Sequence, residues 1–264
     1  MGEPSLLIET SGRGGLVALA VGDAVVGERV LDPARRQNRD LAPFTSELLA
    51  AAGLTPKSLK GVMVSVGPGS YTGLRVGLIS AKALAYAVGC ELVAVPTFAA
   101  IAELAPAELG GVDVVSDGLQ GLVYCQRYER RGGVMTATNA LGILTLADWV
   151  ATGPAAVSGP GVTLADAALD ASVTRASPEL RMPTAASLFA AGRGVAPVTR
   201  EELFALEPLY LRPSSAEEQA SRKAPGERPG ERDRAWVGLV QTLLGEVEDR
   251  EQVALLLLRL RGGQ

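Results

Sequence analysis

The stretch VGPGSYTGLRVG, residues 66–77, lies between a short apolar run and a longer run with helical character. Its first two glycines allow backbone conformations that are closed to residues with a Cβ atom, and Pro68 stiffens the turn between them. Ser70 or Thr72 can cap the helix that follows. The spacing alone leaves three interpretations open: a structural corner, an anion site at a helix start, or a nucleophilic serine.

Residue types elsewhere in the chain favour the structural corner. No lysine follows the turn as in the phosphate loop G-x-x-x-x-G-K-[ST], and the dinucleotide fingerprint does not fit. The sequence contains no histidine, which excludes a Ser-His-Asp triad, a Cys-His pair and an HExxH zinc site. Cys90 and Cys125 have neither metal-type spacing nor the pattern of a disulfide framework. We therefore expect no metal site and no catalytic residue.

The composition is that of a globular protein without strong charge. Of the 264 residues, 47% are hydrophobic and 20% are charged, and the net charge is −4. A nucleic-acid-binding surface is usually strongly basic, so any contact with RNA should depend mainly on a partner. We find neither a signal-peptide pattern at the N-terminus nor an apolar run long enough to span a membrane, and we expect a cytoplasmic protein.

The first part of the chain, residues 1–104, reads as a mixed α/β lobe. Its short apolar runs predict strands over 5–10, 15–21, 24–31, 61–67 and 91–95. Helical spacing and turn signals predict helices over about 39–52, 72–88 and 96–104. Three strands with short connections, followed by alternating helices and strands, are typical of a mixed sheet covered by helices.

Residues 105–212 partly repeat this pattern and predict a second, smaller lobe. Its strands are expected over 111–117, 122–130, 133–144 and 155–158, with helices over 145–151 and 183–194. The helix over 183–194 could return to the first lobe. Residues 213–234 have the charged, Pro/Gly-rich composition of a linker. Residues 235–261 predict a helical segment with an apolar stripe, which docks either on its own chain or on a partner, and its own chain is the favoured interpretation.

The helix expected over 72–88 is apolar on nearly every side. Gly77, Ala81 and Ala85 recur every four residues and form a stripe of small side chains. Helices of this kind are usually buried on every side, so one face should pack on the sheet and the other should be covered. The preceding helix or a second protein could provide the cover, and a core helix of a monomer is an equally good interpretation.

Several of these segments resemble one known family. The runs LLIETS…GLVALAV and LAPFTSELLAAAGL, and above all VSVGPGSYTGLRVGLISAKALAYAVGCELVAVPTFAAIA, are similar to the TsaB (YeaZ) family. Weaker similarity follows in SDGLQGLVYCQRYE, SGPGV, MPTAASL and PLYLR. The resemblance covers about residues 5–212, and the glycine-rich turn with its flanks is its most specific part.

The resemblance implies a fold and a role. The fold is a two-lobed, actin-like (ASKHA, ribonuclease H-like) α/β fold with a mixed five-stranded sheet in the first lobe. The role is that of a non-catalytic scaffold in threonylcarbamoyladenosine modification of tRNA, beside the paralogue TsaD and the ATPase TsaE. ATP and metal are expected in these partner subunits and not in this chain, and tRNA would be bound indirectly.

In this family the two helices of the first lobe pack against TsaD as a four-helix bundle, and the same helices could form a homodimer in isolation. Carried over to this sequence, the resemblance implies partner-binding residues Leu41, Phe44, Leu48, Arg75, Gly77, Leu78, Ala81, Lys82 and Ala85. It also implies a structural turn that aims the second helix, formed by Gly67, Pro68, Gly69, Ser70, Tyr71, Thr72 and Gly73.

One departure concerns the end of the first strand, where the family usually has Asp-Thr-Ser. Here Glu9, Thr10 and Ser11 occupy these positions, which leaves open whether a degenerate nucleotide site survives. The main alternative function is a small ASKHA phosphotransferase, such as a sugar or acid kinase. In that case Glu9, Asp117 with Gly118, and the turn at residues 159–161 would serve the nucleotide.

Overall fold

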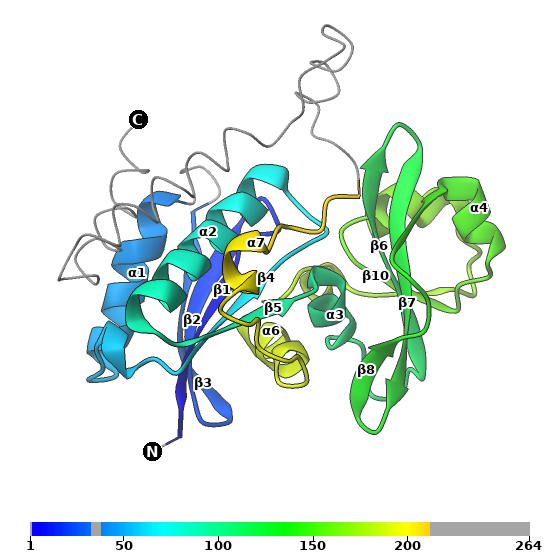
Figure 1. The fold of residues 1–264 in the computed structure, drawn as a ribbon. Helices are drawn as coiled ribbons and strands as arrows, with labels where there is room; N and C mark the ends of the chain where they lie inside the picture. Colours follow the sequence, from blue (N-terminus) through cyan, green and yellow to red (C-terminus); the bar gives the residue numbers. More distant parts are fainter. Residues whose placement is uncertain (1, 33–37, 212–264) are drawn as a thin grey trace, which may run out of the picture.

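The structure is a computed structural model that describes residues 2–32 and 38–211, and it consists of two lobes, each built on a mixed β-sheet (Figure 1). The first sheet has the strand order β3-β2-β1-β4-β5. Its strands are β1 (Pro4–Glu9), β2 (Gly15–Val21), β3 (Ala24–Leu31), β4 (Gly61–Ser65) and β5 (Glu91–Val95). The predicted mixed five-stranded sheet and the two-lobed α/β fold are confirmed.

The connections explain the direction of each strand. β1 pairs with β2 in antiparallel register through a short turn, whereas β1 pairs with β4, and β4 with β5, in parallel. Each parallel pair is joined by a crossover that contains a helix, as parallel strands require. The parallel strands therefore end at the same edge of the sheet, where the glycine-rich turn follows β4.

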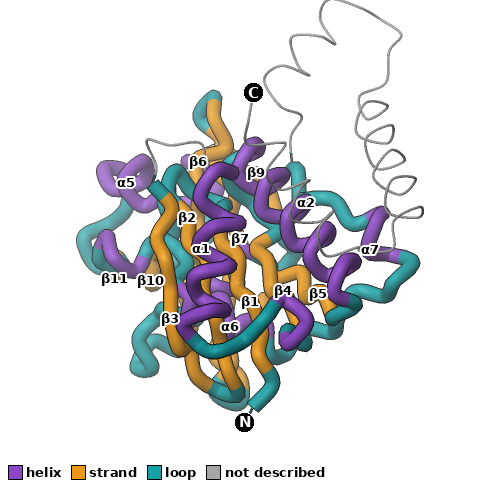
Figure 2. The backbone as a smooth tube through the Cα atoms, turned by 90° about the vertical axis from the view of Figure 1, so that its left-hand side faces the viewer, coloured by secondary structure: helices purple, strands orange, loops and turns teal. Residues whose placement is uncertain are grey.

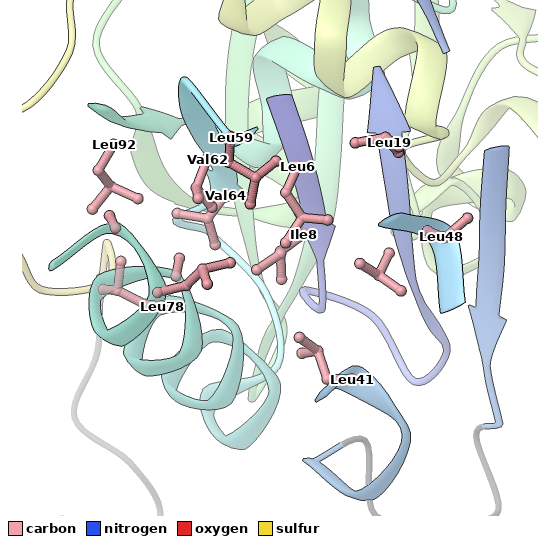
Figure 3. Close-up of a cluster of buried hydrophobic side chains, with 14 of the residues drawn as sticks. Leu6, Ile8, Leu19, Leu41, Leu48, Leu59, Val62, Val64, Leu78 and Leu92 are labelled. Carbon is pink, nitrogen blue, oxygen red and sulfur yellow. The ribbon is translucent and has the colours of Figure 1, made fainter. Parts of the chain in front are cut away.

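Two helices cover one face of this sheet, α1 (Asn38–Ala51) and α2 (Tyr71–Val88) (Figure 2). Leucines from both helices meet strand residues such as Ile8 and Val64 in one buried cluster (Figure 3). The opposite face is covered by α6 (Ala185–Gly192), whose Leu188 is fully buried beside residues of β1 and β5. The helix expected over 183–194 therefore does return to the first sheet.

The second sheet has the order β11-β10-β6-β7-β8, and β9 also pairs with β7. Its strands are β6 (Gly111–Leu119), β7 (Leu122–Arg131), β8 (Val134–Ala137), β9 (Gly142–Thr145), β10 (Ala156–Ser158) and β11 (Thr174–Arg175). The region expected as one strand-like run over 133–144 is thus two strands, because each pairs with a different part of β7.

Shorter helices complete the described part of the chain. They are α3 (Thr97–Ala102), α4 (Leu146–Ala151), α5 (Val162–Ala165), α7 (Glu202–Ala205) and the 3-10 turns η1 (Pro56–Ser58), η2 (Asp166–Ala168) and η3 (Pro178–Leu180). No helix in the described ranges combines the length and apolar character that a membrane span requires. The linker predicted over 213–234 and the helical segment predicted over 235–261 lie outside the described residues.

Candidate partner-binding surface

The glycine-rich turn is held by hydrogen bonds to the chain's own groups. The backbone N–H of Gly67 donates to Thr97 Oγ1 at 3.1 Å, and that of Ser70 donates to the carbonyl of Ser11 at 2.6 Å. The Ser70 hydroxyl accepts from the N–H of Gly73 at 3.3 Å and caps α2, which begins at Tyr71. These amides are occupied within the chain, so the turn acts as a corner that starts α2.

Close packing explains why the turn needs glycine. Gly67 has a φ of +110°, in the region that side chains disfavour. A Cβ at Gly69 would lie 2.5 Å from the carbonyl oxygen of Ser11. The turn therefore lies directly against the residues that follow β1.

The small-residue stripe of α2 faces the chain's own sheet, which corrects its expected place at a subunit interface. A Cβ at Gly77 would overlap the hydroxyl of Thr10. Ala81 and Ala85 are 0% and 2% exposed within the first core cluster. The small side chains let α2 approach β1 and β4 closely, and this contact fixes their orientation.

Other residues expected at the interface are buried for the same reason. Leu41 and Leu48 of α1 and Leu78 of α2 are at most 4% exposed and pack in this core. Phe44 is half-buried against the same cluster, and Arg75 and Lys82 are half-buried. Direct contact of Leu41, Leu48 and Leu78 with a partner was therefore the wrong expectation for this fold, although these residues hold the helices that could make one.

A different set of side chains lies on the outer side of α2. Thr72 and Ile79 are exposed and Ala83 is half-buried, and we call these three residues the outer stripe of α2. Val76 lies between them in sequence but packs against the first core cluster. Ile79 is 36% exposed. Among the described residues of α1 and α2, no other large apolar side chain is as exposed. On α1, Ala50 and Ala51 are exposed together with Ser46 and Glu47. The small side chains among them would allow another helix to pack closely.

A second segment lies along α2, and the sequence did not reveal it. Tyr210, in the run PLYLR, stacks on Tyr71 with ring centroids 4.7 Å apart, and its hydroxyl accepts from Arg75 Nε at 2.9 Å. The Arg75 guanidinium also lies 4.1 Å from the Tyr71 ring centroid. The N–H of Leu209 donates to the carbonyl of Val66 at 2.7 Å. We call residues 199–211 the strap.

The strap also contacts the C-terminal half of α2. Lys82 Nζ donates to the carbonyl of Phe204 at 3.1 Å, and the Phe204 ring meets Tyr86 edge-on at 5.2 Å. Burial lowers the pKa of Lys82, although Glu207 acts in the opposite direction. Arg75 and Lys82 are thus engaged by the chain itself. The aromatic residues near the end of the compact region were the only sequence signal that could have indicated this contact.

The predicted nucleotide residues are buried at the end of β1. Glu9, Thr10 and Ser11 are 3%, 0% and 4% exposed. Glu9 Oε1 accepts from both the N–H and the hydroxyl of Ser11, whereas Glu9 Oε2 and Thr10 Oγ1 have no hydrogen-bond partner among the described residues. Burial raises the pKa of the Glu9 carboxyl above its ordinary value, and the hydrogen bonds from Ser11 only partly oppose this effect.

We predict that Glu9→Gln makes the stability of the protein less dependent on pH, because the buried glutamine side chain does not titrate. Because burial raises the pKa of Glu9 in the folded state, the stabilising contribution of Glu9 is fully present below its unfolded pKa and is lost as the pH rises through its folded-state pKa. The free energy of unfolding, measured with denaturant from pH 4.5 to pH 8, should fall for the parent and stay flatter for Glu9→Gln. Glu108→Gln, at an exposed loop position, is the control. Equal pH profiles for Glu9→Gln and the parent would contradict the prediction.

The residues of the alternative phosphotransferase site do not form an open cradle. A Cβ at Gly159 would overlap the carbonyl oxygen of Val115, and one at Gly161 would lie 2.8 Å from Ser116 Cα. This turn packs on the backbone of β6. Asp117 accepts a hydrogen bond from the N–H of Leu119 at 2.7 Å. Among the described residues there is also no group of three or more Cys, Asp or Glu side chains that could hold a metal ion.

Comparisons with known proteins agree with this fold. Residues 31–200 match the family model of TsaD, tRNA N6-adenosine threonylcarbamoyltransferase. TsaB of Bacillus subtilis, a tRNA threonylcarbamoyladenosine biosynthesis protein, is 29% identical over 55% of this chain and 63% of its own length. TsaB of Escherichia coli is 26% identical over 67% of this chain and 81% of its own. The structure of YeaZ from Pseudomonas aeruginosa superimposes with a TM-score of 0.65 at 24% identity, over 79% of this chain and 100% of that one.

The family model covers well over half of the chain, and the chain belongs to the TsaD family. Proteins named TsaB and YeaZ are similar to it. The match spans less than two thirds of the Bacillus subtilis relative's own length.

Proposed function

We propose that this chain is a non-catalytic subunit in the biosynthesis of threonylcarbamoyladenosine in tRNA. It binds a TsaD-type paralogue through the outer faces of α1 and α2, and the ATPase TsaE joins the assembly. The observation that carries the proposal is the exposed apolar side chain of Ile79 on the outer stripe of α2, in a chain of this family. Isolated chains could pair with each other through the same helices.

The proposed division of labour follows from the residues that this chain offers. It has no histidine, and its phosphate-loop candidates are packed against its own backbone. ATP and metal therefore belong to the partner subunits, and the net charge of −4 assigns most of the tRNA contact to them as well. The assembly works in the cytoplasm, where tRNA is modified.

We predict that the purified chain alone neither hydrolyses ATP nor modifies tRNA. A reconstituted mixture of this chain, the TsaD paralogue, TsaE and the other factors of the reaction should modify tRNA, and omission of this chain should reduce the product at least about tenfold. Threonylcarbamoyladenosine is measured by mass spectrometry of digested tRNA. Robust ATP turnover by this chain alone would favour the phosphotransferase, and unchanged product without the chain would refute the subunit role.

A further inference from the structure

The outer stripe of α2 carries one exposed large apolar side chain, Ile79, and the described residues of the strap cover the adjacent side of the helix. The strap contacts Tyr71, Arg75, Lys82 and Tyr86. It leaves Ile79 36% exposed on the remaining face. An exposed apolar helix face of this kind is expected to meet another surface.

The path of the strap shows where the rest of the chain emerges. Leu209 is hydrogen-bonded to Val66, and Tyr210 stacks on the first turn of α2. The described residues end at Leu211. The following segment therefore starts beside the N-terminal end of the helix whose outer stripe is exposed.

The length of that following segment matches the distance it would have to cover. Residues 213–234 have the composition of a flexible linker. A flexible chain of this length has a root-mean-square span of roughly 25 Å, close to the roughly 27 Å length of an 18-residue helix such as α2. A tethered segment at such a distance has an effective concentration of about 1 mM, so even weak docking would be well populated.

The segment beyond the linker, which lies outside the described residues, has a sequence that complements the outer stripe. Its apolar residues follow helical spacing: Trp236, Leu239, Val240, Leu243, Leu244 and Val247. The apolar pattern of this segment therefore suits the exposed side of α2 around Ile79.

We propose that the apolar stripe of residues 236–247 docks on the outer stripe of α2 of the same chain and competes there with the partner. The docking itself depends only on this chain. The competition rests on the proposed function, because it concerns the face through which the chain would bind the TsaD paralogue. Docking of residues 236–247 then lowers the affinity for the partner, because only the fraction of chains in which this segment is undocked can bind.

The docking is tested in the full-length chain through the fluorescence of Trp236. Trp149, the other tryptophan of the chain, is 1% exposed, so acrylamide should quench it poorly. The variant Trp236→Phe measures the fluorescence of Trp149 alone, which is then subtracted from the total. We expect the quenching constant of Trp236 to rise two- to threefold in Ile79→Lys, and to stay unchanged in Val134→Lys, which changes an exposed residue of the second sheet. Equal quenching in both variants, or full accessibility of Trp236 in the parent, would overturn the proposal. Protection that disappears on dilution would overturn it in favour of a second copy.

The competition is tested with the double variant Leu243→Asp and Leu244→Asp, which leaves α2 unchanged. It should bind the TsaD paralogue about tenfold more tightly than the parent and should show the raised Trp236 quenching. Unchanged affinity would overturn the competition, and weaker binding would make the tail a part of the partner-binding surface. If no variant binds the paralogue, the proposed function fails, and the quenching experiment still decides the docking.

Discussion

Replacing Ile79 with lysine should weaken binding of the TsaD paralogue by at least about 30-fold, because a charge would lie at the centre of the apolar contact between helices. Loss of a central interface residue typically costs about 2 kcal/mol or more. Ile79 is 36% exposed, so the substitution should change the melting temperature by no more than a few degrees. Isothermal titration calorimetry of the paralogue measures the effect, with each substitution made in the full-length chain that already carries Leu243→Asp and Leu244→Asp, so that release of residues 236–247 does not offset the loss.

Val134→Lys is the matched control for this substitution, since Val134 is also an exposed apolar residue but belongs to the second sheet. It should leave the affinity unchanged. Equal losses of affinity in both variants would indicate a general effect of added charge. An Ile79→Lys variant that binds as tightly as the parent would remove the outer stripe of α2 from the interface.

Replacing Ala81 with leucine should destabilise the protein by about 1–3 kcal/mol, because the site is fully buried between α2 and the first sheet. The matched control is Ala83→Leu, which adds the same atoms two residues away, on the half-buried outer stripe. That control should stay within about 0.5 kcal/mol of the parent. Urea unfolding followed by circular dichroism gives both values.

This pair of variants separates the two orientations of α2. If Ala81→Leu weakened partner binding and kept the parent's stability, the small-residue stripe would face the partner after all. The same conclusion would follow if Ala83→Leu were the destabilising substitution.

Much of the fold could be predicted from the sequence because the local signals agree with one another. The apolar runs of β1, β2 and β4 and the turn before α2 each have one reasonable interpretation. The helix at Tyr71–Val88 is found within one residue of its predicted start, since Ser70 caps it and Gly89 ends it in the left-handed conformation. The second sheet was harder, because β8 and β9 are short and their pairing with β7 depends on distant residues.

The orientation of α2 could not be predicted for a physical reason. A helix that is apolar all round carries no amphipathic signal, so neither the small-residue stripe nor the outer stripe stands out as the buried one. The close contact of Gly77 with Thr10 shows that the small-residue stripe faces the sheet. That contact depends on how closely α2 approaches β1, which the sequence of α2 does not contain. The strap was missed because the contacts of Tyr210 join residues more than 130 positions apart in the chain.

The burial of Glu9 could not be predicted from the sequence either. The pattern Glu9-Thr10-Ser11 placed a carboxylate at the end of β1, where a ligand site and a closed structural site look the same in sequence. Packing of the glycine-rich turn against Ser11, together with the low exposure of all three residues, distinguishes them. Packing within the chain does not identify the residues that contact a partner, so the experiments described here test them.

Hydrogen–deuterium exchange of this chain, with and without the TsaD paralogue, tests the account most directly. Binding through the outer faces of the first-lobe helices predicts slower exchange in peptides from Asn38–Ala51 and Tyr71–Val88. Peptides from the second sheet, such as Leu122–Arg131, should exchange at the same rate in both samples. Protection confined to the second sheet, or no protection anywhere at saturating paralogue, would contradict the account.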